Sequence, residues 1–409
     1  MVPTPRADSP LAVRQLDLTY DPFNSEKSAL LLLYTLLPEW QQSEGEINFV
    51  RFTDGITNTL LKAEKKRPGY SQDDIDEEAI LLRAYGEGTD VLIDREREIR
   101  AHSLLACKGL APPLFARFNN GLLYKFIAGD VCAPQDIRRQ EIYCAVAEKL
   151  GQWHGSLSID AISDVQDLQA RTNGQVNGAA KTWVPFPNLW SVLQSWIDAL
   201  PAQNDSQRQR IKTLQVEYDQ LKSQLIKSHG LYGRDYIFSH CDLLCGNVIV
   251  QKSRTNGHAN GNTKPKIGFI DYEYATPAPA AFDIANHFAE WGGFDCDYSA
   301  MPTKSQRREF IGHYVASYRH HVNPDSSEAS EAGAVEHLYA QVDLFRGVPG
   351  FYWGVWALIQ AQISQIDFDY PSYAEVRLGE YYAWKAETDG SRAKEGKEMP
   401  LRERRWASE

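Results

Sequence analysis

The amino-acid sequence predicts an α+β protein in which a small antiparallel-sheet lobe is followed by a larger, mostly helical lobe. Strand-like runs and a hairpin pattern crowd the chain before about residue 130, whereas segments with helical apolar spacing dominate the rest. The 409 residues and the hydrophobic content of 43% are sufficient for two lobes with a sizeable core. We expect a sheet lobe over residues 26–128, a helical lobe over 129–388, and flexible ends at 1–25 and 389–409.

Local patterns predict the elements of the first lobe. A buried helix is expected from residue 26 up to Pro38, which cannot continue it, and two strands follow in "INFVRFT" and "NTLLKAE". A third strand is expected in "AILLRAYG", and "REREIRAHSLLACKGL" has the charge and apolar spacing of a helix. The segment "LFARFNNGLLYKFIAG" predicts a hairpin in which Asn120 and Gly121 form a type I′ turn.

Helical spacing of apolar residues characterises the second lobe. It begins in "RRQEIYCAVAEKLGQWHG", and a longer stripe follows at Ile211, Leu214, Tyr218, Leu221 and Leu225. Because this stripe lasts barely two heptads, we expect it to face the core rather than a partner helix. Residues 171–182 and 253–266 are polar and are expected to form loops, the second of them between two strands.

Composition excludes several functional classes. The chain has 54 acidic and 43 basic residues, so it lacks the positive charge that nucleic-acid binding requires, and a cationic substrate suits it better. Its longest apolar run, residues 29–37, is far shorter than the ~20 residues that span a bilayer, and it lies too far from the first residue for a signal peptide. The six cysteines show no CxxC pair or zinc-like spacing, which indicates reduced thiols. We therefore expect a soluble cytoplasmic protein.

The motif that carries chemistry is "HCDLLCGN", which places His240, Asp242 and Asn247 inside a strongly apolar stretch. Such polar side chains are costly to bury unless each has a partner. About twenty residues later, the strand-like "KIGFI" leads into Asp271. This order suits phosphoryl transfer, in which one aspartate accepts the proton of an attacking hydroxyl while an asparagine and a second aspartate hold Mg²⁺. We expect His240 to orient the loop through hydrogen bonds rather than to react.

This interpretation has an alternative, because three fixed residues in eight arise by chance and an aspartate at a strand end is usually a turn or cap residue. The second aspartate at the right spacing, behind a sheet-then-helix chain, favours the phosphoryl-transfer hypothesis. The first lobe adds "TDGITNTL", whose Thr57 and Asn58 could supplement backbone donors to phosphates, although a single glycine makes it a weak phosphate loop. Arg83 lies mid-strand among apolar residues and needs an anion, either phosphate or a glutamate such as Glu98, unless it is exposed.

Six segments in order resemble the choline/ethanolamine kinases, from about Ile47 to Tyr382. They are "FTDGITNTL", "LLRAYG", "GLAPPLFARFNNGLLYKFIAG", "FSHCDLLCGNVI", "FIDYEYATPAPAAFDIANHFAEW" and "FYWGVWALIQAQISQIDFDY". The resemblance implies a protein-kinase-like two-lobed fold with ATP and Mg²⁺ as cofactors. It also assigns the following roles: Asp242 as catalytic base, Asn247 and Asp271 as Mg²⁺ ligands, and Arg83 with Glu98 as the phosphate-lobe pair.

Two residues depart from the family pattern. Lys125 stands at the hinge where an acidic residue is common, and Cys241 replaces an asparagine that is usual in the catalytic loop. Adenine is recognised largely by hinge backbone, so the first departure puts little in doubt. The second can alter hydrogen bonding in the loop.

The substrate pocket is expected near Trp353 and Trp356, whose i, i+3 spacing lets both face one side of a helix and hold an ammonium group by cation–π attraction. Tryptophans at this spacing are otherwise core residues. The resemblance places them, with Tyr373 and Glu290, at the family's substrate-binding positions. A carboxylate suits a primary ammonium, although Glu290 could equally be a surface acid of its helix.

Together these residues predict ATP-dependent phosphorylation of ethanolamine, the first step of phosphatidylethanolamine synthesis. Choline or dual-specificity kinase activity is the main alternative, and an aminoglycoside-type phosphotransferase or an inactive nucleotide-binding scaffold are further ones. The preference for ethanolamine depends on Leu244, where choline kinases carry glutamine, and on Gly292 and Gly293, where they carry added tyrosines nearby. Asp295 and Asp297 could add acceptors for a primary ammonium, unless they face solvent.

Overall fold

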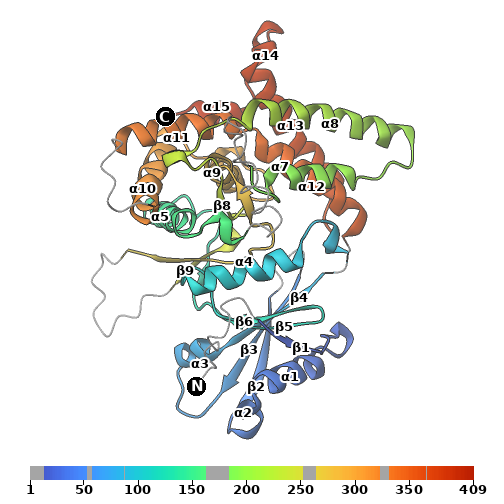
Figure 1. Ribbon diagram of the computed structural model, residues 1–409, viewed down its shortest axis with the longest axis vertical. Helices are drawn as coiled ribbons and strands as arrows, with labels where there is room; N and C mark the ends of the chain where they lie inside the picture. The colour runs from blue at the N-terminus through green and yellow to red at the C-terminus, as the bar shows by residue number, and fades with distance from the viewer. Residues whose placement is uncertain are drawn as a thin grey trace, which may run out of the picture.

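The computed structural model describes residues 13–52, 58–86, 88–162, 184–251, 264–322, 331–364 and 366–409. It has the predicted architecture: a small lobe built on one sheet and a larger lobe that is mostly helical (Figure 1). The loops expected at 171–182 and, for the most part, at 253–266 lie outside the described residues.

A six-stranded sheet forms the small lobe, in the order β1-β5-β6-β4-β3-β2. Its strands are β1 (Arg14–Leu16), β2 (Glu46–Phe52), β3 (Asn58–Lys66), β4 (Ile80–Tyr85), β5 (Leu114–Phe118) and β6 (Gly121–Lys125). Neighbours pair antiparallel except β1 and β5, which run parallel. The helices of this lobe are α1 (Ser25–Leu36), α2 (Pro38–Gln42), α3 (Gln72–Glu78) and α4 (Arg95–Cys107).

Helices α1 and α2 cover one face of the sheet, and α4 lies along the boundary between the lobes (Figure 1). The chain ends α1 at Leu36 because Pro38 lacks an N–H donor, and Pro38 instead begins α2, where that donor is not needed. Leu33 of α1 and Trp40 of α2 pack with Leu61 and Leu82 of the sheet in one apolar cluster. This packing fixes the strands that carry the site residues of the lobe.

The hairpin between β5 and β6 forms where the sequence predicts it, but the predicted turn is wrong. Phe118 pairs with Gly121, so the two turn residues are Asn119 and Asn120, and neither has the positive φ of a type I′ turn. Gly121 instead pairs within β6, where the position requires glycine because a Cβ atom would collide with the backbone oxygen of Arg83. The Asn120 side chain instead bonds the backbone of Tyr20, accepting from its N–H at 2.9 Å and donating to its carbonyl at 3.0 Å.

The expected flexible leader is wrong for residues 13–25. These residues form β1 at the edge of the sheet and a 3₁₀ turn over Pro22–Asn24, and Tyr20 is buried against the lobe's core. Backbone pairing with β5 and the Asn120 bridge supply the hydrogen bonds that order this segment.

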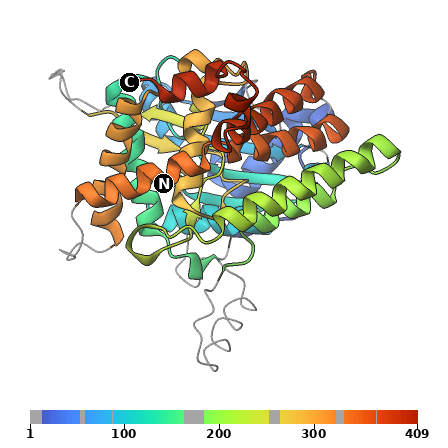
Figure 2. The same cartoon turned by 90° about the horizontal axis from the view of Figure 1, so that it is seen from above.

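The large lobe surrounds two short sheets, β7–β9–β10 and β8–β11, with helices (Figures 1 and 2). Its strands are β7 (Asp130–Val131), β8 (Ile237–Ser239), β9 (Val248–Gln251), β10 (Lys266–Phe269) and β11 (Thr276–Ala278). Its main helices are α5 (Gln140–Ser156), α7 (Leu189–Asp198), α8 (Asp205–Leu225), α9 (Ala280–Ala289), α10 (Lys304–Val322), α11 (Glu331–Phe345), α12 (Val348–Ile363) and α13 (Tyr370–Thr388). The stripe on α8 faces the core, as predicted, since Leu214, Tyr218, Leu221 and Leu225 are all buried. Among the helices that the structure describes, none is long and apolar enough to cross a membrane.

The predicted flexible tail at 389–409 is also wrong. Residues Ser391–Lys394 form α14 and Leu401–Ala407 form α15. Trp406 anchors α15: its indole N–H donates to Asp343 at 2.6 Å, and the guanidinium of Arg307 stacks 3.9 Å from a ring centroid. A charged, glycine-containing segment predicts flexibility, but one buried tryptophan with a paired N–H outweighs that composition.

Candidate active site

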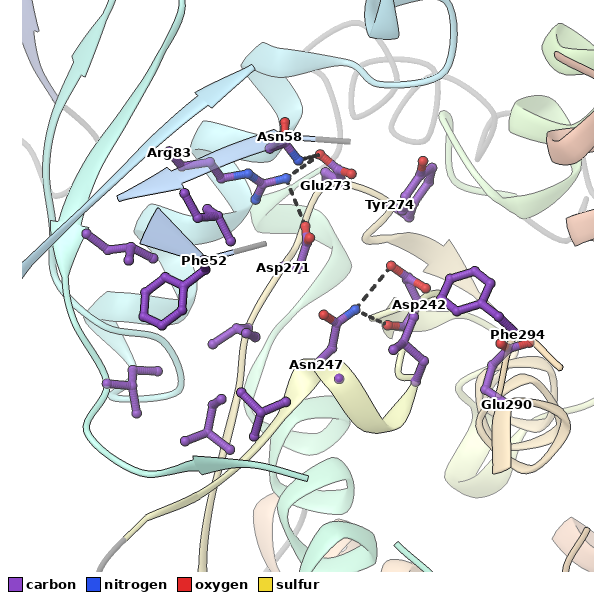
Figure 3. A pocket seen from close by; sticks show the side chains of 18 of the residues that line it. Phe52, Asn58, Arg83, Asp242, Asn247, Asp271, Glu273, Tyr274, Glu290 and Phe294 are labelled. Carbon is purple, nitrogen blue, oxygen red and sulfur yellow. Dashed lines mark hydrogen bonds and ion pairs between the residues drawn. The ribbon is translucent and has the colours of Figure 1, made fainter. Parts of the chain in front are cut away.

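A cavity of about 250 Å³ lies between the two lobes and collects most of the predicted site residues. Apolar side chains around Phe52 form one end, carboxylates crowd the middle, and Phe294 and Glu290 lie at the other end (Figure 3). The lining residues that bear on function are Asn58, Arg83, Asp242, Leu244, Asn247, Asp271, Glu273, Tyr274, Glu290, Phe294, Trp353, Trp356 and Tyr373. Thr57 lies outside the described residues.

The loop after β8 carries Asp242 into the middle of this cavity. Its backbone oxygen and its carboxylate accept hydrogen bonds from the Asn247 amide at 2.8 and 3.1 Å (Figure 3). Burial raises the pKa of Asp242 well above its ordinary value, and the negative charges of Asp271, Glu290 and Glu273 add to the rise. A carboxylate with a raised pKa is a stronger proton acceptor than a solvated one, so Asp242 is suited to be a general base.

His240 fixes the position of this loop rather than facing the cavity. Its ring bonds the backbone oxygen of Ile270 at 3.0 Å, and burial lowers its pKa to about 4, so the ring is neutral at physiological pH. The bond also ties the Asp242 loop to the segment that leads to Asp271.

Helix α9 supports the loop from behind through Asp283, which sequence reasoning missed. Its carboxylate accepts from the backbone N–H groups of His240 at 2.9 Å and Cys241 at 2.8 Å, and it bonds the His154 ring at 2.9 Å. Asn286 continues the support by donating to the carbonyl of Cys241 at 2.9 Å. A signal was present in the sequence, since an aspartate inside the apolar run "AAFDIANHF" needs buried partners.

The departure at Cys241 has a structural meaning. Its backbone has a φ of +63°, in the left-handed region where asparagine is better tolerated than cysteine. Its thiol is fully buried and lies 3.9 Å from the backbone oxygen of Thr276. The bonds from Asp283 and Asn286 hold the backbone in this conformation with cysteine in place.

Arg83 forms the ionic centre of the cavity. It is buried, and its guanidinium lies 3.1 Å from the predicted partner Glu98. It also lies 2.9 Å from Asp271 and contacts Glu273 (Figure 3). Burial acts to lower the pKa of Arg83, but the carboxylates of Asp271, Glu273 and Glu98 raise it well above the ordinary value. The alternative of an exposed Arg83 is therefore wrong, and the residue stays charged.

Glu273 and Arg95 complete this ionic centre and were not predicted. Glu273 accepts from Asn58 and Arg95, both at 3.2 Å, and Arg95 also bonds Glu98 at 2.9 Å. The Arg95 guanidinium stacks 3.9 Å from the ring centroid of Tyr85. The signal for Glu273 was its position two residues after Asp271 in "DYEY", which places a second acid at the same strand end.

The donor set in the middle of the cavity fits Mg²⁺. Asn247 and Asp271 offer the oxygen atoms that this ion prefers, and the Asn247 amide also donates to the neighbouring Asp242 carboxylate at 3.1 Å. Burial and the Asp271 charge raise the pKa of Glu273, as they do that of Asp242, so these acids repel one another. A divalent cation among them would relieve the repulsion. Asp271 also has a φ of +64°, the kind of backbone strain that is found at functional sites.

Trp353 and Trp356 form the wall at the other end of the cavity. Their rings contact each other edge to face, with centroids 5.4 Å apart. The indole N–H of Trp353 donates to Asn286 and that of Trp356 donates to the Tyr274 hydroxyl, both at 2.8 Å. Because both N–H groups have protein partners, the pair offers a ligand its ring surfaces rather than hydrogen bonds.

Glu290 lies at the same end, in the turn after α9, but it has a partner that the sequence did not reveal. The carboxylate is buried and lies 2.8 Å from the guanidinium of Arg377, four residues after Tyr373 on α13. Burial raises the pKa of Glu290, and the positive charge of Arg377 opposes the rise. The alternative of a surface acid is thus wrong.

The loop beyond Glu290 contributes an aromatic side chain instead of the expected acids. Phe294 lines the cavity and its ring lies 6.0 Å from that of Tyr373. Asp295 and Asp297 are exposed and are not among the described lining residues, and Asp297 caps the turn at Ser299, accepting from its N–H at 3.0 Å. The idea that they supply acceptors to the substrate is therefore wrong.

Comparison with known proteins places the chain in a family. The model of the choline/ethanolamine kinase family matches residues 49–382. The chain belongs to the choline/ethanolamine kinase family. The resemblance and the two-lobed fold predicted from six sequence segments are thereby confirmed.

Members of the choline/ethanolamine kinase family with curated descriptions are similar over nearly the whole chain. Ethanolamine kinase 1 of Mus musculus is 32% identical, over 92% of this chain and 94% of its own length. Ethanolamine kinase 2 of Homo sapiens is 30% identical, over 91% and 85% respectively. Among solved structures, a Plasmodium vivax ethanolamine kinase has a TM-score of 0.64 at 24% identity, covering 87% of this chain and 88% of that one. A choline kinase from Cryptosporidium parvum has a TM-score of 0.62 at 19% identity, covering 90% and 97%.

Proposed function

We propose that this chain transfers the γ-phosphoryl group of ATP to the hydroxyl of ethanolamine, producing phosphoethanolamine and ADP. This would be the first step of phosphatidylethanolamine synthesis by the CDP-ethanolamine route, carried out in the cytoplasm. The observation that carries the proposal is one continuous cavity in which the buried carboxylate of Asp242 lies between an acidic, Arg83-containing centre and a tryptophan wall. Ethanolamine kinase relatives over most of the chain support the choice of substrate.

In this mechanism the apolar end of the cavity, around Phe52, receives the adenine ring. Arg83 would pair with phosphate oxygens, and Asn247 and Asp271 would hold Mg²⁺, which would neutralise charge on the phosphates. Asp242 accepts the proton of the substrate hydroxyl as that oxygen attacks phosphorus. The hydrogen bond from Asn247 to Asp242 keeps one carboxylate oxygen in place and leaves the other for the hydroxyl.

Recognition of the ammonium group would come from charge and from aromatic surface. Four carboxylates and one guanidinium are among the residues that line the cavity, so its potential favours cations. A tryptophan face contributes about 0.5–2 kcal/mol to a bound cation, depending on desolvation. The Glu290 carboxylate offers a hydrogen-bond acceptor, which a primary ammonium needs and a trimethylammonium cannot use.

We expect kcat/KM for ethanolamine to exceed that for choline by at least about tenfold, which is roughly 1.4 kcal/mol of differential transition-state binding. Leu244 lines the cavity where choline kinases carry glutamine, and Gly293, with a φ of +62°, adds no side chain beside Phe294. The pocket therefore lacks the extra polar and aromatic groups that would enclose a larger head group. Phosphate transfer to each alcohol, measured side by side at saturating ATP and Mg²⁺, checks the ratio.

A reaction without acceptor is the control for that comparison, because it measures ATP hydrolysis alone. An equal or reversed ratio would assign the chain to the choline or dual-specificity kinases, whose substrate would use the same tryptophan wall. No transfer to either alcohol, with normal nucleotide binding, would instead identify an inactive scaffold.

Asp271→Ala is expected to weaken the response to Mg²⁺ and to lower turnover, because it removes a metal ligand and a partner of Arg83. Turnover measured as a function of Mg²⁺ at fixed ATP should show a higher half-saturating concentration than wild type. Asp295→Ala is the matched control. It also removes a carboxylate, but Asp295 is exposed and is not among the described residues that line the cavity. If Asp271→Ala has the same turnover as wild type at limiting Mg²⁺, Asp271 does not bind the metal and only caps the end of the strand.

A further inference from the structure

The geometry points to a second metal site, away from the active site, where α5 and α10 bind one Zn²⁺ through Cys144, Glu309 and His313, with Glu148 beside them. One ligand atom from each of the first three residues lies within 4.8 Å of the other two. Glu148 adjoins this group, with its carboxylate 2.9 Å from Nδ1 of His313. None of these four residues is among the described lining of the catalytic cavity.

Helical spacing brings these ligands together in two facing pairs. Cys144 and Glu148 are four residues apart on α5, and Glu309 and His313 are four apart on α10, so each pair shares one face of its helix. Contacts between the two helices advance in the same direction along both of them: Glu148 of α5 lies beside His313 of α10, and Gly151 lies beside Tyr314. The two helices therefore run parallel with the pairs opposite each other.

Close packing of α5 and α10 makes this arrangement rigid. A Cβ atom at Gly151 would come within 2.5 Å of the backbone oxygen of Tyr314, and one at Gly155 within 2.7 Å of the His321 side chain. The helices approach this closely only because both positions are glycine. The backbone that presents the ligands is thus fixed, and only side-chain rotation is needed to close the group around an ion.

The donor set is that of zinc rather than magnesium. A thiolate, an imidazole and one or two carboxylates match the ligands of Zn²⁺, whereas Mg²⁺ takes oxygen ligands and keeps several waters. Zinc–ligand bonds of about 2.0–2.3 Å place tetrahedral ligands roughly 3.3–3.8 Å apart, so separations within 4.8 Å need only a small side-chain adjustment on binding.

Surrounding side chains already orient the ligands. The Glu309 carboxylate accepts from the Tyr143 hydroxyl and, at 2.5 Å, from the amide of Gln140. The bond between His313 and Glu148 fixes the orientation of the imidazole ring, in the way that carboxylates support metal-binding histidines.

The site would brace the support of the catalytic loop. Tyr314, the residue after His313, bonds the His154 ring at 2.8 Å, and His154 in turn bonds Asp283 at 2.9 Å. A metal that clamps α5 to α10 therefore stabilises the helices on which this buried chain depends. Zinc binding can therefore be detected as a change in melting temperature, without an activity assay.

The test uses the full chain without an affinity tag, in a phosphine reductant, with saturating Mg²⁺ to occupy the catalytic carboxylates. Calorimetric titration should show about one Zn²⁺ per chain, and zinc should raise the melting temperature. Replacement by Co²⁺ should give visible bands of a tetrahedral ion and a near-ultraviolet thiolate-to-cobalt band.

Cys144→Ser and His313→Asn should each weaken zinc binding by at least about tenfold and abolish the zinc-dependent rise in melting temperature. The matched control is Cys107→Ser, which changes an exposed thiol on α4 and should bind zinc as wild type does. His313 is partly exposed, so His313→Asn keeps the test decisive if Cys144→Ser does not fold. Absence of zinc binding by wild type, or equal affinity in His313→Asn, would overturn the proposal.

Discussion

Asp242→Asn is expected to lower turnover by about 10²–10⁴-fold, the usual cost of losing a general acid–base group, while nucleotide binding stays nearly intact. The asparagine keeps the size of the side chain and can still accept the hydrogen bond from Asn247, so the loop geometry should persist. It cannot accept the proton of the substrate hydroxyl, so the proposed mechanism loses its general base.

Turnover with ethanolamine and affinity for ATP with Mg²⁺ should be measured on the same preparation of Asp242→Asn. Asp295→Asn, which makes the same chemical change at an exposed position, should match wild type in both measurements. If Asp242→Asn keeps more than half of the wild-type turnover, Asp242 is not the base.

Asp283→Ala is expected to destabilise the protein by about 3–5 kcal/mol, because it removes one member of a buried, hydrogen-bonded cluster. Two backbone N–H groups, of His240 and Cys241, and the His154 ring would lose their acceptor in a fully buried place. Urea denaturation gives the change in the free energy of unfolding. Turnover should fall as well, since these bonds hold the loop that carries Asp242.

The pH dependence of that loss has a definite sign. Burial acts to raise the pKa of Asp283, but the hydrogen bond and charge of His154, together with the His240 partner, hold it below its ordinary 3.8. A carboxylate with a depressed pKa contributes stability that is present above the unfolded pKa and is lost as the pH falls through the folded one. The difference in unfolding free energy between wild type and Asp283→Ala should therefore be constant near neutrality and shrink below about pH 4. A difference independent of pH would show that Asp283 acts without its charge.

The sequence signal for the proposed catalytic loop is local. His240, Asp242 and Asn247 lie within eight residues, between apolar strands that can bury them, and Asp271 lies two residues after the end of β10. The order of strands and helices was equally readable, since it follows from apolar periodicity that each segment shows by itself.

The missed residues share a different property: their partners are distant in the chain. Arg377 meets Glu290 across 87 residues, and Glu273 meets Arg83 across 190. Nothing in the local pattern around Arg377 on α13 distinguishes a buried guanidinium from a solvated one. The ends of the chain were misjudged for the same reason, because Trp406 and Tyr20 are ordered by contacts with remote segments.

The ion pairs around Arg83 join the two lobes of the protein. Arg83, Arg95 and Glu98 belong to the sheet lobe, whereas Asp271 and Glu273 belong to the helical lobe, so ion pairs of two guanidinium groups connect the lobes. The phosphate oxygens of a bound triphosphate would compete with Asp271 and Glu273 for the guanidinium of Arg83. We therefore expect nucleotide binding to change the ionic contacts between the lobes, while the apolar contacts of Ala101 and Leu105 with the large-lobe core remain.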